Sequence, residues 1–89
     1  MSLVSKYLFK LTDSYVELPQ NAQLLRCGVR DPDTLFVYAL IDETAPTIKR
    51  SIKFYTTGQT LGNSATSNYV DTVTIGPYIY HIFDHGQIN

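Results

Sequence analysis

The chain has 89 residues, of which 44% are hydrophobic and 17% charged, and its formal net charge is −1. This length fits one domain, residues 1–89, and the composition excludes a chain too polar to fold. The balanced charge gives no overall field to attract long nucleic acid or an anionic membrane. The longest apolar run, residues 35–41, is far shorter than the roughly 20 residues that span a bilayer. The single cysteine, Cys27, cannot form an internal disulfide, so we expect a protein of a reducing compartment.

Apolar and polar residues alternate with a period of two along most of the chain, and helical spacing is almost absent. This alternation predicts short strands over residues 6–11, 15–18, 24–30, 35–41, 48–57, 69–75 and 78–84. The sequence Asp31-Pro32-Asp33 is typical of a turn and predicts a hairpin over residues 24–42. Its second arm is apolar on both faces and is expected to be the central, most buried strand. Six to seven short strands predict an all-β fold, a small antiparallel sandwich or barrel.

Several short motifs follow one another over nearly the whole chain. They are Val16-Glu17-Leu18-Pro19, Tyr38-Ala39-Leu40-Ile41-Asp42, Thr57-Gly58 and the closing Tyr80-His81-Ile82-Phe83-Asp84. In this order and spacing the chain resembles an uncharacterised family of very small proteins encoded by tailed bacteriophages, although Tyr38 and Tyr80 stand where tryptophan is common. The resemblance implies a bacteriophage protein in the cytoplasm of the host. No activity comes with it.

The residues that could carry catalysis or hold a metal are few and poorly spaced. Cys27 falls in an expected inward-facing row with Leu25 and Val29, where a free cysteine behaves as a small hydrophobic residue. His81 and His85 would lie about 13 Å apart along a strand, and the chain has no CxxC or HExxH motif. We therefore expect a protein that is not an enzyme, with no catalytic residue, metal or cofactor.

One predicted strand is rich in positive charge. Lys49, Arg50 and Lys53 lie on it, and residues 44–70 contain no acidic residue. Lys49 and Lys53 are expected on one side, with Tyr55 beyond them, and Arg50 on the other. Cations that bind phosphate beside rings that stack on bases are typical of nucleotide recognition. The sequence leaves an alternative open, that this is an edge strand whose charges prevent unwanted strand pairing.

A second group of candidate residues lies near the C-terminus. Tyr69, Tyr78 and Tyr80 form a cluster with His81, and a pocket could form here with the hydroxyl and backbone amide of Thr57-Gly58. A histidine among apolar neighbours is equally open to a structural role in the core. The predicted ligand-binding residues are Lys49, Arg50, Lys53, Tyr55, Thr57, Gly58, Tyr78, Tyr80 and His81.

Two functions follow as hypotheses. The first is a binding module that sequesters a phosphorylated small molecule, such as a nucleotide signal of host defence. The alternative is a structural or interaction protein that binds a host or virion protein through a tyrosine-rich face. Under both hypotheses a small domain with exposed strand edges is expected to form a homo-oligomer.

Overall fold

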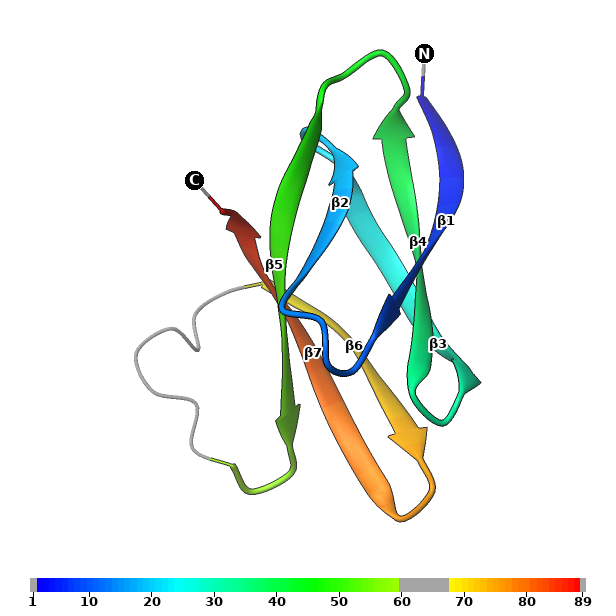
Figure 1. Cartoon of the computed structure of the whole chain (residues 1–89), viewed down its shortest axis with the longest axis vertical. Coiled ribbons are helices and arrows are strands. Elements are labelled where there is room, and N and C mark those ends of the chain that lie inside the picture. Colours follow the sequence, from blue (N-terminus) through cyan, green and yellow to red (C-terminus); the bar gives the residue numbers. More distant parts are fainter. Residues whose placement is uncertain (1, 60–67, 89) are drawn as a thin grey trace.

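The computed structural model describes residues 2–59 and 68–88, which Figure 1 shows as an assembly of strands. The strands are β1 (Ser2–Lys10), β2 (Tyr15–Pro19), β3 (Gln23–Asp31), β4 (Thr34–Asp42), β5 (Thr47–Thr56), β6 (Asn68–Ile75) and β7 (Tyr78–Gln87). In these two stretches of chain no helix is long and apolar enough to cross a membrane.

The strands form two antiparallel sheets, one with the order β1-β4-β3 and the other with the order β2-β5-β7-β6. The prediction of an all-β antiparallel fold is therefore confirmed, and the architecture is a two-sheet sandwich. Side chains from the two inner faces meet between the sheets, where the largest fully buried ones are Leu18, Leu35, Val37 and Ile82. Burial of each such side chain stabilises the fold by roughly 1.5–3 kcal/mol.

The predicted hairpin is present, and its second arm is the central strand of the three-stranded sheet. Asp31 at the end of β3 pairs with Thr34 at the start of β4. Only the inner face of β4 is fully covered. Leu35 is buried on the inner face, whereas Tyr38 and Leu40 on the outer face are 40% and 37% exposed. β4 still has more buried residues than any other strand, so the prediction that the second arm is the central, most buried strand is confirmed.

The inward row expected on β3 is shifted by an irregularity in the strand. The register between β3 and β4 slips between Leu24 and Arg26, so one extra residue is accommodated there. Leu24 packs against the core as a result, and Leu25 is 39% exposed, contrary to the expectation. Cys27 does pack against the core, but Val29 at the end of the row is 38% exposed.

The two flanks of the sandwich, where the edge strands of the sheets face each other, are built differently. On one flank β3 and β6 are in contact, and the backbone N–H of Cys27 donates to Oδ2 of Asp71 at 2.9 Å. Asp71 thereby joins the two sheets. On the other flank β1 and β2 make far fewer contacts.

Candidate functional site

The outer face of β5, β7 and β6 carries a group of aromatic rings beside a lysine. Lys53 on β5 pairs with Phe83 on β7, and Phe83 pairs in turn with Tyr69 on β6. The Tyr69 and Tyr55 rings both meet the Phe83 ring edge-on, with centroid distances of 5.7 and 5.6 Å. Such T-shaped pairs are favourable because the positive edge of one ring meets the negative face of the other. We call Tyr55, Tyr69 and Phe83 the aromatic platform.

His81 lies next to the aromatic platform and is held by hydroxyl groups on both of its ring nitrogens. Nε2 lies 2.8 Å from Oγ1 of Thr57, and Nδ1 lies 3.1 Å from Oγ1 of Thr72. The Thr72 hydroxyl is in turn 2.7 Å from the hydroxyl of Tyr69. Because a hydroxyl can both donate and accept, these contacts suit either tautomer of the imidazole. The two contacts therefore hold the ring in one orientation.

A second histidine extends this face toward the end of β7. The hydroxyl of Tyr55 lies 3.3 Å from Nε2 of His85, and the two rings are 6.3 Å apart. Alternation along β7 places His81, Phe83 and His85 on the same face of the sheet. The face thus combines rings with groups that donate hydrogen bonds.

A cavity of about 240 Å³ opens on this face, between the end of β5 and the middle of β7. It is lined by Tyr55, Thr56, Thr57, Gly58, Gln59, Tyr69, His81 and Phe83. Four of the residues singled out from the sequence, Tyr55, Thr57, Gly58 and His81, lie together there. Gly58 has a φ of 89°, a conformation that glycine adopts readily, and it turns the chain at the rim of the cavity. Apolar walls with a few polar groups are typical of small-molecule sites.

Lys49 lies on the same side of β5 but outside the cavity. Its Nζ is 4.9 Å from the centroid of the Tyr15 ring, and its Cα partner on β2 is Glu17. β5 pairs with β2 as well as with β7, but the pairing with β2 extends only as far as Ser51, which leaves Lys53 beyond the end of β2. The alternative that residues 48–57 form an edge strand is therefore wrong for the part that carries Lys49 and Arg50 and holds for the part that carries Lys53.

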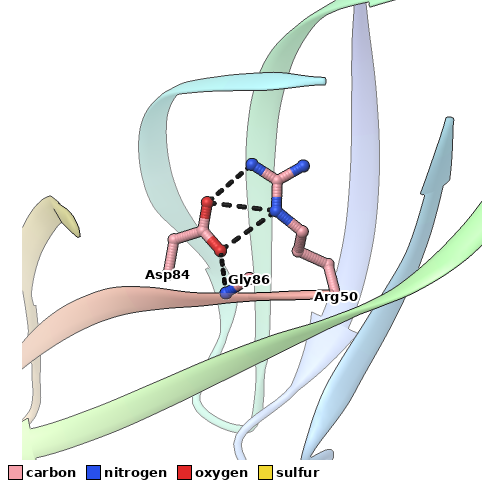
Figure 2. A network of polar contacts seen from close by, with 3 residues as sticks. All are labelled: Arg50, Asp84 and Gly86. Carbon is pink, nitrogen blue, oxygen red and sulfur yellow. Dashed lines mark hydrogen bonds and ion pairs between the residues drawn. The ribbon is translucent and has the colours of Figure 1, made fainter. Parts of the chain in front are cut away.

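Arg50 lies on the opposite, inner face of β5, where Figure 2 shows it bound to Asp84. Its Nε donates to both carboxylate oxygens at 3.0 and 3.1 Å, and its Nη2 donates to Oδ2 at 2.7 Å. The backbone N–H of Gly86 donates to Oδ1 at 2.9 Å. The side chains of Arg50 and Asp84 are only 14% and 6% exposed. Arg50 is therefore engaged inside the fold and does not join the other predicted site residues.

Tyr78 and Tyr80 also lie apart from the cavity. They line a separate groove of about 580 Å³ between the tips of two hairpins, together with Arg30 and Ile75. Tyr78 is 58% exposed at the start of β7. The predicted set is thus divided among the cavity, the groove, the inner face of the sheet and the exposed outer surface of β5, where Lys49 and Lys53 lie.

Sequence reasoning left out Thr72, Phe83 and His85, although a signal for two of them was available. Because side chains alternate along a strand, Phe83 and His85 lie on the same face of β7 as His81. Thr72 becomes visible only through the pairing of β6 with β7, in which it is the partner of His81.

The charged groups of these strands are divided between the two faces. Asp71 and Asp84 both point inward, to Cys27 and Arg50, so β5, β7 and β6 present no carboxylate on the outer face. Burial raises the pKa of the Cys27 thiol from its ordinary value of 9.0 to about 12, and the Asp71 carboxylate adds to the rise. The thiol therefore stays protonated and is a poor nucleophile. Within residues 2–59 and 68–88, no group of three or more His, Cys, Asp or Glu side chains is placed to hold a metal ion.

Comparison with known proteins identifies a family. No curated protein and no solved structure matches the chain. Residues 1–88 match the family model described as Domain of unknown function (DUF7352). Because the match leaves out only the last residue, the chain belongs to this uncharacterised family.

Proposed function

We propose that the protein is a non-enzymatic module that binds a phosphorylated, ring-bearing small molecule of the nucleotide class on the outer face of β5, β7 and β6. The observation that carries the proposal is the cavity of about 240 Å³ between the aromatic platform and His81. The resemblance to bacteriophage proteins supports a host nucleotide, such as a defence signal, as the molecule that is sequestered.

The aromatic platform supplies the part of the site that would bind the base. The rings of Tyr55 and Tyr69 each lie within 6 Å of the Phe83 ring, and all three residues line the same cavity. A base that stacks on an aromatic side chain gains about 1–3 kcal/mol. Three rings from three adjacent strands provide such a surface without any movement of the backbone.

Hydroxyl, amide and cationic groups supply the part of the site that would bind phosphate. Thr57, Gly58 and His81 lie at the wall of the cavity, and Lys53 is exposed beside Phe83. Hydrogen bonds from such donors to an anion are stronger than neutral ones because the acceptor is charged. The absence of carboxylates from the outer face of these three strands removes the main source of repulsion.

Protein binding through one tyrosine-rich face has less support. The most exposed tyrosines are Tyr15, Tyr38, Tyr69 and Tyr78, at 39% to 58% exposure. They belong to four different strands in both sheets, so they do not form one continuous face.

Thermal stability in the presence of ligand tests the proposal. A panel of mono-, di- and cyclic nucleotides is added at millimolar concentration, and the melting temperature is measured. A ligand at 100 times its Kd stabilises the folded state by about 2.7 kcal/mol, so at least one nucleotide should raise the melting temperature. If none does, the proposed function is wrong.

Paired charge reversals locate the site. Lys53→Glu should abolish the stabilisation because it places a carboxylate beside the platform, and Lys49→Glu should weaken it less. Lys10→Glu is the matched control, since Lys10 is an exposed lysine at the end of β1 in the other sheet. Equal effects of Lys53→Glu and Lys10→Glu would contradict binding at this face.

A further inference from the structure

The four edge strands of the sandwich are not equally protected. β3 and β6 contact each other, and the carboxylate of Asp71 on β6 accepts a hydrogen bond from the backbone N–H of Cys27 on β3. β2 has only five residues and ends in Pro19, which cannot donate to another strand. β1 has nine residues, contains neither proline nor glycine, and pairs with β4 without any register shift. Figure 1 shows β1 at the right-hand margin of the molecule, beside β4.

Half of the backbone groups of β1 point away from β4. In an antiparallel pair, residues that exchange hydrogen bonds alternate with residues that do not. Leu11, just after β1, donates its N–H to the carbonyl oxygen of Asp33 at 3.1 Å, so the odd-numbered residues of β1 bond to the β4 side. The N–H of Lys10 goes instead to the side chain of Asp13 at 2.8 Å. The N–H and C=O groups of Val4, Lys6 and Leu8 therefore face the open edge.

The side chains along this edge are apolar as well as exposed. Val4 is 57% exposed and Leu8 47%, with Lys6 between them. Natural sheets protect such long, regular edges with proline, bulges or inward-facing charges, and a strand without them readily pairs with another strand. β1 has no proline, bulge or inward-facing charge; an edge lysine, a further device of this kind, occurs at Lys6, but its neighbours Val4 and Leu8 on the same face are apolar.

We propose that β1 pairs antiparallel with β1 of a second copy of the chain, which joins two three-stranded sheets into one sheet of six strands. A two-fold axis at Ser5 or Tyr7 places Lys6 of one copy opposite Val4 or Leu8 of the other, where the lysine stem packs on an apolar side chain. A two-fold axis at Lys6 would place the two lysines opposite each other, which is unfavourable. The alternation of apolar residues and lysine on the exposed face of β1 therefore matches the same face of an antiparallel second copy. The surface lies on the other sheet from the proposed nucleotide site and is independent of it.

The oligomeric state tests this surface. Light scattering at micromolar to millimolar concentration should show a species of about twice the monomer mass of 10.1 kDa. Leu8→Pro removes one edge N–H without removing a hydrogen bond to β4, and it should give a monomer. Leu40→Lys is the matched control, since Leu40 is an exposed leucine on the same sheet but lies on β4, which is paired on both sides. This variant should stay dimeric.

Three outcomes would overturn the proposal. They are a wild-type protein of 10.1 kDa at every concentration, a dimer that survives Leu8→Pro, and a dimer lost in Leu40→Lys. Far-UV circular dichroism shows whether each variant is folded. If Leu8→Pro unfolds, two lysine substitutions replace it as the test. Leu8→Lys places a lysine opposite Lys6 of the other copy when the two-fold axis is at Tyr7. Val4→Lys does the same when the axis is at Ser5. A folded protein with both changes that remains dimeric contradicts the proposal.

Discussion

The strands β5 and β7 carry two polar networks, one on each face of the same sheet, and the two differ in almost every physical respect. On the inner face Arg50, Asp84 and Gly86 form a buried, charged network around an irregularity in the β5–β7 pairing. On the outer face Thr57 and His81 belong to a network of hydroxyl groups and an imidazole. The first network stabilises a particular register, whereas the second lies at the wall of the cavity on which the proposed function rests.

This difference follows from where each network meets water. If one partner of a buried ion pair is removed, the other charge is left without solvent, which costs about 3–5 kcal/mol. If one partner of an exposed hydrogen bond is removed, water replaces it and stability changes little. Inward-facing residues of a strand can therefore stabilise the fold while the outward-facing residues between them line a surface cavity.

The largest effect is expected from Asp84→Ala. The variant leaves the Arg50 guanidinium buried without its carboxylate, so the free energy of unfolding should fall by about 3–5 kcal/mol. Urea denaturation followed by tyrosine fluorescence measures the loss. The double variant Arg50→Met with Asp84→Leu should recover most of the stability, because it removes both charges and keeps the volume. A loss below 1 kcal/mol for Asp84→Ala would mean that the inner network does not stabilise the fold.

A smaller effect is expected where a carboxylate is only partly buried. Asp71→Ala removes the hydrogen bond to the N–H of Cys27, and a bond to a charged group contributes about 1.5–3 kcal/mol. Arg26→Ala is the control, since Arg26 lies 3.9 Å from the same carboxylate and its side chain is 83% exposed. It should change the free energy of unfolding by less than about 0.5 kcal/mol. Equal losses in the two variants would assign the stabilisation to the ion pair.

The third effect appears only at alkaline pH. The pKa of Cys27 is about 12 in the folded chain, above its ordinary value of 9.0, so the unfolded chain loses this proton first as pH rises. The contribution of Cys27 to stability should be constant below pH 9 and fall between pH 9 and about 12. Urea denaturation of wild type and Cys27→Ala across this range isolates it. A pH dependence that is identical in both proteins would show that the thiol is not buried as described.

The smallest effect on stability is expected on the outer face. His81→Ala removes a half-buried side chain whose hydroxyl partners, on Thr57 and Thr72, are exposed and can bond to water, so the free energy of unfolding should fall by less than about 1 kcal/mol. Nucleotide affinity should fall about tenfold or more, because the imidazole no longer orients the Thr57 hydroxyl at the wall of the cavity, and a hydrogen bond from this hydroxyl to a charged group is weakened. Thr74→Ala, on the same face of β6 but outside the cavity, should change neither quantity. A large stability loss in His81→Ala would erase the distinction between the two networks.

Much of the fold could be predicted because alternation is a local property of the chain. All seven predicted strands exist, and the largest differences in length are in β1 and β7, each of which is three residues longer than the pattern indicated. The pattern missed residues 2–5 of β1 because the small polar Ser5 occupies an inward position and interrupts the apolar row. β7 continues to Gln87 because Gly86, with a φ of 87°, allows an irregularity in the pairing where the sequence indicates an end.

The site could be predicted only in part, because it depends on which strands are neighbours. Thr57 and His81 are 24 residues apart, and the pairing of β5 with β7 brings them together. The same pairing brings Arg50 to Asp84, which no local pattern indicates. Strand order and register are decided by the packing of the whole core, so the sequence pattern gave candidate residues without their partners.

The bond between Asp71 and Cys27 has a consequence for the proposed pairing of β1. In each copy the carboxylate of Asp71 occupies the flank at β3 and β6, so among the described strands the three-stranded sheet has one free edge, at β1. A sheet that is extended at one edge stops at a pair and does not grow into a fibre. In the proposed dimer, a side chain between the two sheets thus limits the assembly to two copies.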